Sequence, residues 1–243
     1  MTAAPRTAPR PQLVSIHFVI VTALFVTALI AANVMSVKLV NIAGVEIDAG
    51  TIIFPMTYIF GDVLTEVYGY GRARQVIWLG FFCNLLFVLA MWAGQIAPAS
   101  SNFDAQPAYE RILGYTPRLL LASFSAYLVG EFVNSYILAR LKVATHGRFL
   151  WLRTISSTMA AQAVDSIIFI TIAFAGEVSW AVVWVIARNN WILKTTYEVL
   201  ATPLTYLIVT RLKTIEGVDV YDRDTNWNPF AWLPFVGSAR QTG

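Results

Sequence analysis

Two carboxylates lie one helical turn apart in the stretch GDVLTEVYGYGRAR, residues 61–74, directly after the apolar run TIIFPMTYIF. Asp62 and Glu66 therefore share one face of any helix that continues this run. An ionised side chain in the middle of a membrane helix costs about 3 kcal/mol on insertion scales, so it is retained where it finds a partner or does chemistry. The chemistry open to a buried carboxylate is to accept hydrogen bonds from a ligand or to carry a proton.

Three more apolar segments carry ionisable side chains, each with polar neighbours three or four residues away on the same helix face. Such faces must point inward, away from lipid. Asp165 and Glu198 lie roughly ten residues from either end of their segments, which is the depth at which membrane proteins place ligand sites. The candidate binding residues are Asp62, Glu131, Asn134, Gln162, Asp165, Lys194, Tyr197 and Glu198.

Some of these side chains also have a purely structural interpretation. Glu66 approaches the end of its segment, where it can pair with Arg72 or Arg74 and leave the deeper carboxylate to the site. If both carboxylates face the interior instead, their repulsion makes one of them a candidate proton carrier. Lys194 and Glu198, four residues apart, can form an ion pair that serves only the fold. The isolated Asn33 and Asn84 are interpreted first as hydrogen bonds between helices.

The elements that must position these residues are membrane helices. The chain of 243 residues is 57% hydrophobic and 13% charged, more apolar and less charged than a soluble domain. A helix needs ~20 residues to cross a hydrocarbon core. We therefore predict an all-α, polytopic fold with one transmembrane domain over residues 13–213. Its six expected spans are 13–37, 50–69, 74–94, 117–139, 154–175 and 184–210.

Lysine and arginine are distributed unevenly between the two sides of this arrangement. The side with both termini holds twelve of them and the other side holds four. Because positive residues in short loops stay in the cytoplasm, we predict a disordered cytoplasmic tail at 1–12 and a cytoplasmic tail at 214–243. Three spans precede the long loop at 93–118 and three follow it, so a 3+3 inverted repeat would place Asp62 and Asp165 in equivalent middle helices.

Several protein classes are excluded or disfavoured by the composition. Cys83 is the single cysteine, so an intramolecular disulfide and a Cys-rich metal site are excluded. His17 and His146 are too few for a catalytic or metal cluster. The formal charge of +3 comes from loop residues that set topology, and it indicates no nucleic-acid partner. We expect no metal and no cofactor, and an intramembrane enzyme is the least favoured class because no nucleophile elbow occurs.

Four stretches together resemble the bacterial queuosine-precursor transporter family, which is also grouped with vitamin-uptake-like membrane proteins. They are MTYIFGDVLTEVYGYGRAR, SSTMAAQAVDSIIF, KTTYEVLATPLTY and EGVDVYDRDTNWNPF. The resemblance extends over nearly the whole chain after residue 30. It implies a multi-pass protein of the bacterial inner membrane that takes up a precursor for tRNA modification: 7-cyano-7-deazaguanine, 7-aminomethyl-7-deazaguanine or queuine.

The candidate residues suit such a base, which presents a flat ring, an acceptor carbonyl, and adjacent N–H and NH₂ donors. Asp165 or Glu198 can accept from the donor edge, and Gln162 or Lys194 can donate to the carbonyl. Aromatic rings can cover the face of the base. The candidate stacking residues are Phe124, Phe132 and Trp191, beside Tyr197.

Two modes of uptake remain open from the sequence. The favoured one is a stand-alone carrier, and the alternative is a substrate-capture subunit that works with a separate ATP-driven module. The chain has no Walker-type loop, so any ATPase would be another protein. The expected partners are a small nucleobase and the lipid bilayer, and homo-oligomerisation, the coupling ion and the preferred base are left open.

Overall fold

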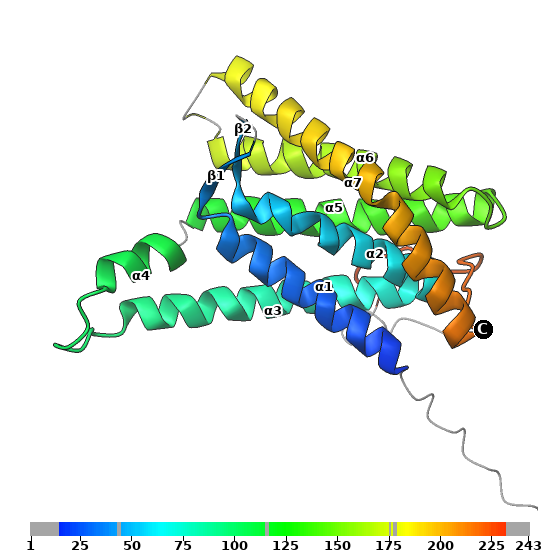
Figure 1. Ribbon diagram of the computed structural model, residues 1–243, viewed down its shortest axis with the longest axis horizontal. Helices are drawn as coiled ribbons and strands as arrows, with labels where there is room; N and C mark the ends of the chain where they lie inside the picture. Colours follow the sequence, from blue (N-terminus) through cyan, green and yellow to red (C-terminus); the bar gives the residue numbers. More distant parts are fainter. Residues whose placement is uncertain (1–14, 43–44, 115–116, 175, 177–178, 232–243) are drawn as a thin grey trace, which may run out of the picture.

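The computed structural model describes residues 15–42, 45–114, 117–174, 176 and 179–231. The tail expected at 1–12 and the last twelve residues of the tail expected at 214–243 lie outside this part of the chain. The long helices are α1 (Ile16–Met35), α2 (Phe54–Tyr68), α3 (Tyr70–Ile96), α5 (Pro117–Ala144), α6 (Leu150–Phe174) and α7 (Trp180–Glu216). They form one bundle in which α6 and α7 pack together on one side and α1 and α3 on the other (Figure 1).

The predicted all-α class is confirmed. Of the six predicted spans, four are supported by the length and composition of the helices. Within the part of the chain that the structure describes, four helices are long and apolar enough to cross a membrane: α1, α3, α5 and α6. The predicted second span is the 15-residue helix α2, which rises only ~22 Å. The predicted sixth span falls in α7, which is 37 residues long and contains Pro203.

Helix α2 is the central element of the bundle. It packs against α1, α3, α5 and α7, and every side chain from Thr57 to Tyr68 is buried. Pro55 stands in its first turn, where a missing N–H costs nothing. The helix ends at Gly69, whose φ of 82° is open to glycine but strained for other residues. A Cβ at Gly69 would also lie 2.7 Å from the Val220 side chain, so this turn requires glycine.

Two short strands and one short helix fall in segments that the sequence predicted as loops. Strands β1 (Leu39–Ile42) and β2 (Val45–Asp48) pair antiparallel and lead into the 3-10 helix η1 (Ala49–Ile52). Helix α4 (Gln106–Leu113) lies within the long loop at 93–118. The hairpin and α4 lie at the same end of the molecule (Figure 1). Strands of four residues are too short to show periodicity against an apolar background, so they could not be predicted from the sequence pattern.

The start of α1 and the end of α7 meet at the opposite end of the molecule. Ser15 and His17 both bond to the Glu216 carboxylate, with His17 Nδ1 at 2.5 Å. The chain then returns across α2, α3 and α5 as a segment that we call the C-terminal strap, residues 217–230. Lys142 Nζ donates to the Val220 carbonyl at 2.6 Å, and the strap is thereby joined to α5.

The strap is also bonded to the first turns of α3. Arg74 Nη1 donates to the carbonyls of Asn226 and Asn228, both at 2.8 Å. Trp78 Nε1 donates to the Pro229 carbonyl at 2.9 Å. Because these donors are buried or nearly so, the strap stabilises this end of the bundle as an integral part of the fold.

Candidate functional site

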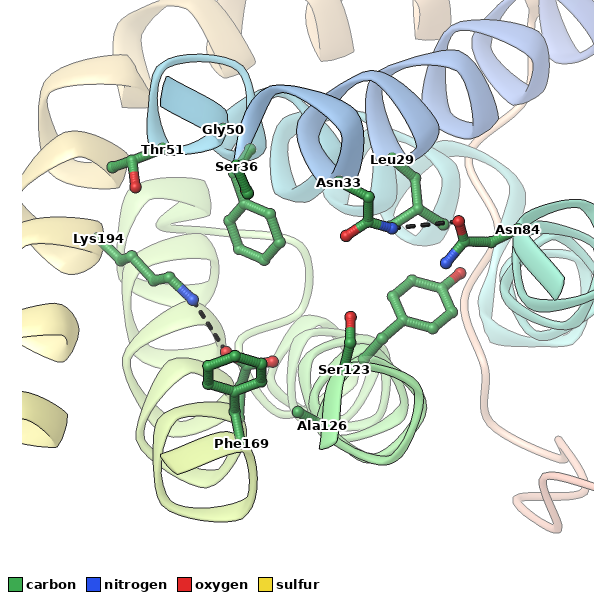
Figure 2. A pocket seen from close by; sticks show the side chains of 13 residues that line it. Leu29, Asn33, Ser36, Gly50, Thr51, Asn84, Ser123, Ala126, Phe169 and Lys194 are labelled. Atoms are coloured by element: carbon green, nitrogen blue, oxygen red, sulfur yellow. Dashed lines mark hydrogen bonds and ion pairs between the residues drawn. The ribbon is translucent and has the colours of Figure 1, made fainter. Parts of the chain in front are cut away.

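A cavity of about 670 Å³, its open mouth included, lies among the helices at the end away from the strap. Its walls come from late α1, η1, the start of α2, the middle of α3, early α5, late α6 and α7 (Figure 2). This convergence of many elements on one polar cavity is typical of a small-molecule site.

An ion pair forms one wall of this cavity. Lys194 Nζ of α7 lies 2.9 Å from Asp165 Oδ2 of α6, and both side chains are largely buried. The same ammonium lies 4.3 Å from the ring centroid of Phe54, within cation–π range. The sequence left open an ion pair between Lys194 and Glu198 along their own helix. The structure pairs Lys194 with Asp165 instead, because the two helices present these side chains to a shared interior.

Amides and hydroxyls form the opposite wall. Asn33 Nδ2 of α1 donates to Asn84 Oδ1 of α3 at 3.1 Å, which confirms the predicted hydrogen bond between helices. Ser123 of α5 points into the same space (Figure 2). Tyr127 also lines the cavity, with its hydroxyl bonded to the Ile77 carbonyl at 3.0 Å. The cavity therefore offers a charged pair on one side and neutral polar groups on the other.

Behind Asp165, five more predicted residues are buried in the bundle. Glu131, Asn134, Gln162 and Glu198 are at most 2% exposed, and Asp62 is fully buried. Asn134 Nδ2 donates to Asp62 Oδ1 at 2.7 Å. The carboxylate of Glu131 is within electrostatic range of both Asp165 and Glu198. These acids thus form one group, which we call the buried acid cluster: Asp62, Glu131, Asp165 and Glu198.

Tyr58 is the residue at the centre of the buried acid cluster that sequence reasoning missed. It is 2% exposed and within electrostatic range of all four acids. Tyr58 precedes Asp62 by four residues, and this spacing on a known polar face was the signal that could have found it. Small residues allow the close packing: a Cβ on Gly61 would lie 3.1 Å from Glu131 Oε2.

Several buried oxygens in and beside this cluster have no hydrogen-bond partner among the residues that the structure describes. They are Asp62 Oδ2, Glu131 Oε2, Gln162 Oε1 and Glu198 Oε1. Buried polar atoms in proteins are nearly always bonded, so unpartnered ones point to a bound proton, water or ligand group. The cluster is therefore equipped to hold protons or ligand donors deep in the bundle.

The aromatic residues predicted to stack on a ligand lie elsewhere. Phe124 packs on Phe81, Phe132 packs near Trp78, and Trp191 donates its Nε1 to the Met159 carbonyl. Tyr197, also predicted for the site, is 39% exposed. The rings that line the cavity are Phe54, Tyr127 and Phe169. In a chain that is 14% aromatic, composition carries no signal that separates these rings from the others.

Glu66 belongs to a separate ionic cluster near the strap. Among the described residues, its ion-pair partners are Arg153 Nη2 at 2.7 Å, Lys213 Nζ at 2.7 Å and Lys142 Nζ at 3.7 Å. The expectation that Glu66 pairs with Arg72 or Arg74 was therefore wrong. Gly69 turns the chain, so Arg72 lies over the Phe18 ring and Arg74 reaches the strap.

Asp219 of the strap completes this ionic cluster. Its Oδ1 lies 2.5 Å from Lys142 Nζ and 2.9 Å from Lys213 Nζ. Partial burial raises the pKa of this carboxyl, but hydrogen bonds from the two ammonium groups outweigh that effect and leave the pKa below its usual value. The cluster joins α2, α5, α6, α7 and the strap through Glu66, which is fully buried.

Comparison with known proteins matches this chain to one family over most of its length. Residues 48–208 match the family described as "Putative vitamin uptake transporter". A "Probable queuosine precursor transporter" of Bacillus subtilis (strain 168) is 31% identical over 181 residues, which are 74% of this chain and 79% of that protein. No solved structure matches the chain.

Two further relatives are more distant. The "Queuosine precursor transporter" of Escherichia coli (strain K12) is 26% identical over 56% of this chain and 58% of its own length. A protein named "Probable queuosine precursor transporter" from Haemophilus influenzae is 27% identical over 51% of each chain. The matched span contains α2 with Asp62 and Glu66, the cavity's ion pair and the buried acid cluster. The chain belongs to the vitamin uptake transporter family that includes these queuosine precursor transporters.

Proposed function

We propose that this protein imports a 7-deazaguanine precursor of queuosine across the bacterial inner membrane, and that the base binds at the Asp165–Lys194 pair. The names of the relatives support the substrate class. The ion pair on the cavity wall is the observation that carries the choice of site.

The chemistry of the pair matches the edge of a deazaguanine. Its ring N–H and NH₂ donors lie next to each other and suit one carboxylate, while the neighbouring carbonyl suits an ammonium. Asp165 and Lys194 offer these two groups 2.9 Å apart. Phe54 and Phe169 supply flat apolar surface beside them. Each precursor named above carries this edge, so the pair recognises the class rather than one member.

Import is coupled to protons in this proposal. The unpartnered oxygens of Asp62, Glu131 and Glu198 supply a chain of proton-binding groups that begins next to the cavity and leads inward. Such relays of buried acids are typical of proton-driven carriers. A capture subunit that depends on a separate ATPase needs no such chain.

Uptake of a radiolabelled deazaguanine precursor by the purified protein in sealed vesicles tests this function. We expect accumulation with an imposed proton gradient and its loss when an ionophore collapses the gradient. Binding without accumulation would favour the ATP-dependent alternative. Absence of both binding and uptake for every precursor would refute the substrate class.

Six spans with both ends in the cytoplasm complete the proposal. The basic side chains of Arg74, Lys142, Arg153 and Lys213 gather at the end that also holds the strap, and the positive-inside rule assigns that end to the cytoplasm. The 3+3 inverted repeat remains part of the proposal, with Asp62 and Asp165 in its two middle helices.

Cysteine labelling tests this orientation in a Cys83→Ser background. A membrane-impermeant reagent added to intact cells is expected to label Asp104→Cys and to leave Arg148→Cys unlabelled until the cells are opened. Arg148 is preferred over Gly147, because Gly147 has a φ of 76° and a Cβ there would lie 2.0 Å from the Tyr221 hydroxyl. External labelling at 148 would invert the orientation.

A further inference from the structure

A long apolar groove runs along the outer surface between α3, α5 and the strap. Its volume, open solvent included, is about 1060 Å³, and its walls include Trp78, Val129, Phe132, Tyr136 and Phe230. Three of these side chains remain well exposed: Val129 at 42%, Tyr136 at 39% and Phe230 at 48%. From Val129 to Ile137 the groove follows about 12 Å of helix α5.

A second recess continues this groove toward the end of α5, and its volume, open solvent included, is about 890 Å³. The two share Tyr136 and Ile137, so they form one surface with an apolar part and a part that also carries charges. The charged part is lined by Arg140 and Arg223 beside Leu141 and Val143. The order along the helix therefore places two guanidinium groups where the apolar groove ends.

Both arginines are available to an anion. Within the part of the chain that the structure describes, neither has a carboxylate partner. Arg140 lies over the Trp227 ring with 4.9 Å to its centroid, and Arg223 lies over the Tyr221 ring at 5.9 Å. Asp222 is the acidic residue in this recess, but Tyr70 N–H and the Thr225 hydroxyl occupy its two oxygens.

We propose that this surface binds one anionic phospholipid, with an acyl chain in the groove between Val129 and Phe230 and the phosphate between Arg140 and Arg223. Charge complementarity selects an anionic head group, because two unneutralised guanidiniums adjoin the apolar part. The groove lies at the basic end of the bundle. The positive-inside rule assigns this end to the cytoplasmic side of the membrane, where the leaflet carries anionic lipid. The strap forms one wall of the groove, so the lipid would bind more tightly when the strap is in place.

Native mass spectrometry of the full chain in detergent tests this site with dioleoyl phosphatidylglycerol, and dioleoyl phosphatidylcholine is the neutral comparison. We expect at least about tenfold tighter binding of the anionic lipid, since a charge-assisted contact is worth that much. At a lipid concentration tenfold above its dissociation constant, the Tm should rise by about 3–6 °C.

Two variants separate the head group from the chain. Arg140→Gln combined with Arg223→Gln should remove the preference for the anionic lipid, while Arg211→Gln, an exposed arginine outside the groove, should keep it. Val129→Trp should fill the groove and weaken both lipids, while Leu121→Trp, exposed on the same helix, should weaken neither.

Four results would overturn the proposal. They are equal binding of both lipids by the unchanged protein, a preference that survives in the double arginine variant, full competition by glycerol 3-phosphate, and a second copy of the chain in the groove. The third would show that a phosphate alone is the ligand. The fourth would appear as a dimer that Val129→Trp disrupts.

Discussion

Asp165→Asn is expected to reduce uptake per folded protein by about 10- to 100-fold, because it removes a charge-assisted contact to the substrate. The variant keeps the shape of the side chain and half of its acceptor capacity. Glu198→Gln is expected to reduce uptake as well. The Glu198 carboxylate lies in the buried acid cluster, which carries protons in the proposed mechanism of import. Membrane expression of both should stay close to that of the unchanged protein.

Three comparisons make this prediction specific. Tyr197→Phe changes an exposed residue one position from Glu198 and should transport normally. If Asp165 only neutralises Lys194, then adding Lys194→Gln to Asp165→Asn would restore uptake. If Asp165 binds the base, as we propose, the double variant stays inactive. Normal transport and affinity in both Asp165→Asn and Glu198→Gln would show that the site lies elsewhere.

The sequence could predict the polar interior because lipid imposes a strong rule. An ionisable side chain in an apolar helix must face inward, so the buried positions of Asp62, Glu131, Asp165 and Glu198 followed from their types alone. Their partners did not follow. Lys194 meets a residue 29 positions away on another helix, and only the packing angle of α6 on α7 decides that.

The same limit explains why the predicted stacking residues do not line this cavity and why Glu66 has other ion-pair partners than expected. Phe54 lines the cavity because it is the first residue of α2 and follows η1, an element that the hydrophobic periodicity did not predict. Glu66 was expected to find the nearest arginines in the sequence. The chain turns at Gly69, so those arginines lie away from Glu66. Arg153, which is 87 positions away in the sequence, pairs with Glu66 instead. Charges close in sequence are a weak guide where a chain reverses direction.

Glu66→Gln is expected to destabilise the fold by about 3–5 kcal/mol, which is the range for a buried ion pair that loses one partner. The change leaves Arg153, 1% exposed, without a buried anion to offset its desolvation. Thermal unfolding in detergent should show a large fall in Tm, together with a lower yield of folded protein from membranes. Molecules that do fold should still transport, because Glu66 lies outside the cavity.

A double-variant cycle shows whether the loss arises from this ion pair. Arg153→Gln alone should be about as damaging, whereas Glu66→Gln with Arg153→Gln should lose less than the sum of the two, since both buried charges are gone. Arg72→Gln is the matched control near Glu66 in the sequence, and it should have a small effect. Additive losses in the cycle would show that the two side chains act independently.

Asp219→Asn should have a smaller effect, with a defined pH dependence. Its side chain is 42% exposed, and solvent screens the pair. Because the folded-state pKa lies below the usual 3.8, the stability from Asp219 is present above that value and is lost as the pH falls through the lower folded pKa. The variant should therefore differ from the unchanged protein near neutral pH and converge with it in acid.

Asp62 and Glu66 share one face of α2, yet we expect their substitution to affect different properties, uptake for Asp62 and stability for Glu66. Asp62 accepts one bond from Asn134, and its second oxygen has no partner among the described residues, so Asp62→Asn should impair uptake in well-folded protein. Glu66 is held by cations from three helices, so its loss should appear first in stability. Uptake divided by folded protein separates the two. A silent Asp62→Asn with a well-folded but inactive Glu66→Gln would exchange their roles and would place the proton path at the Glu66 cluster, because a carboxylate needed only for folding cannot stop transport in a folded molecule.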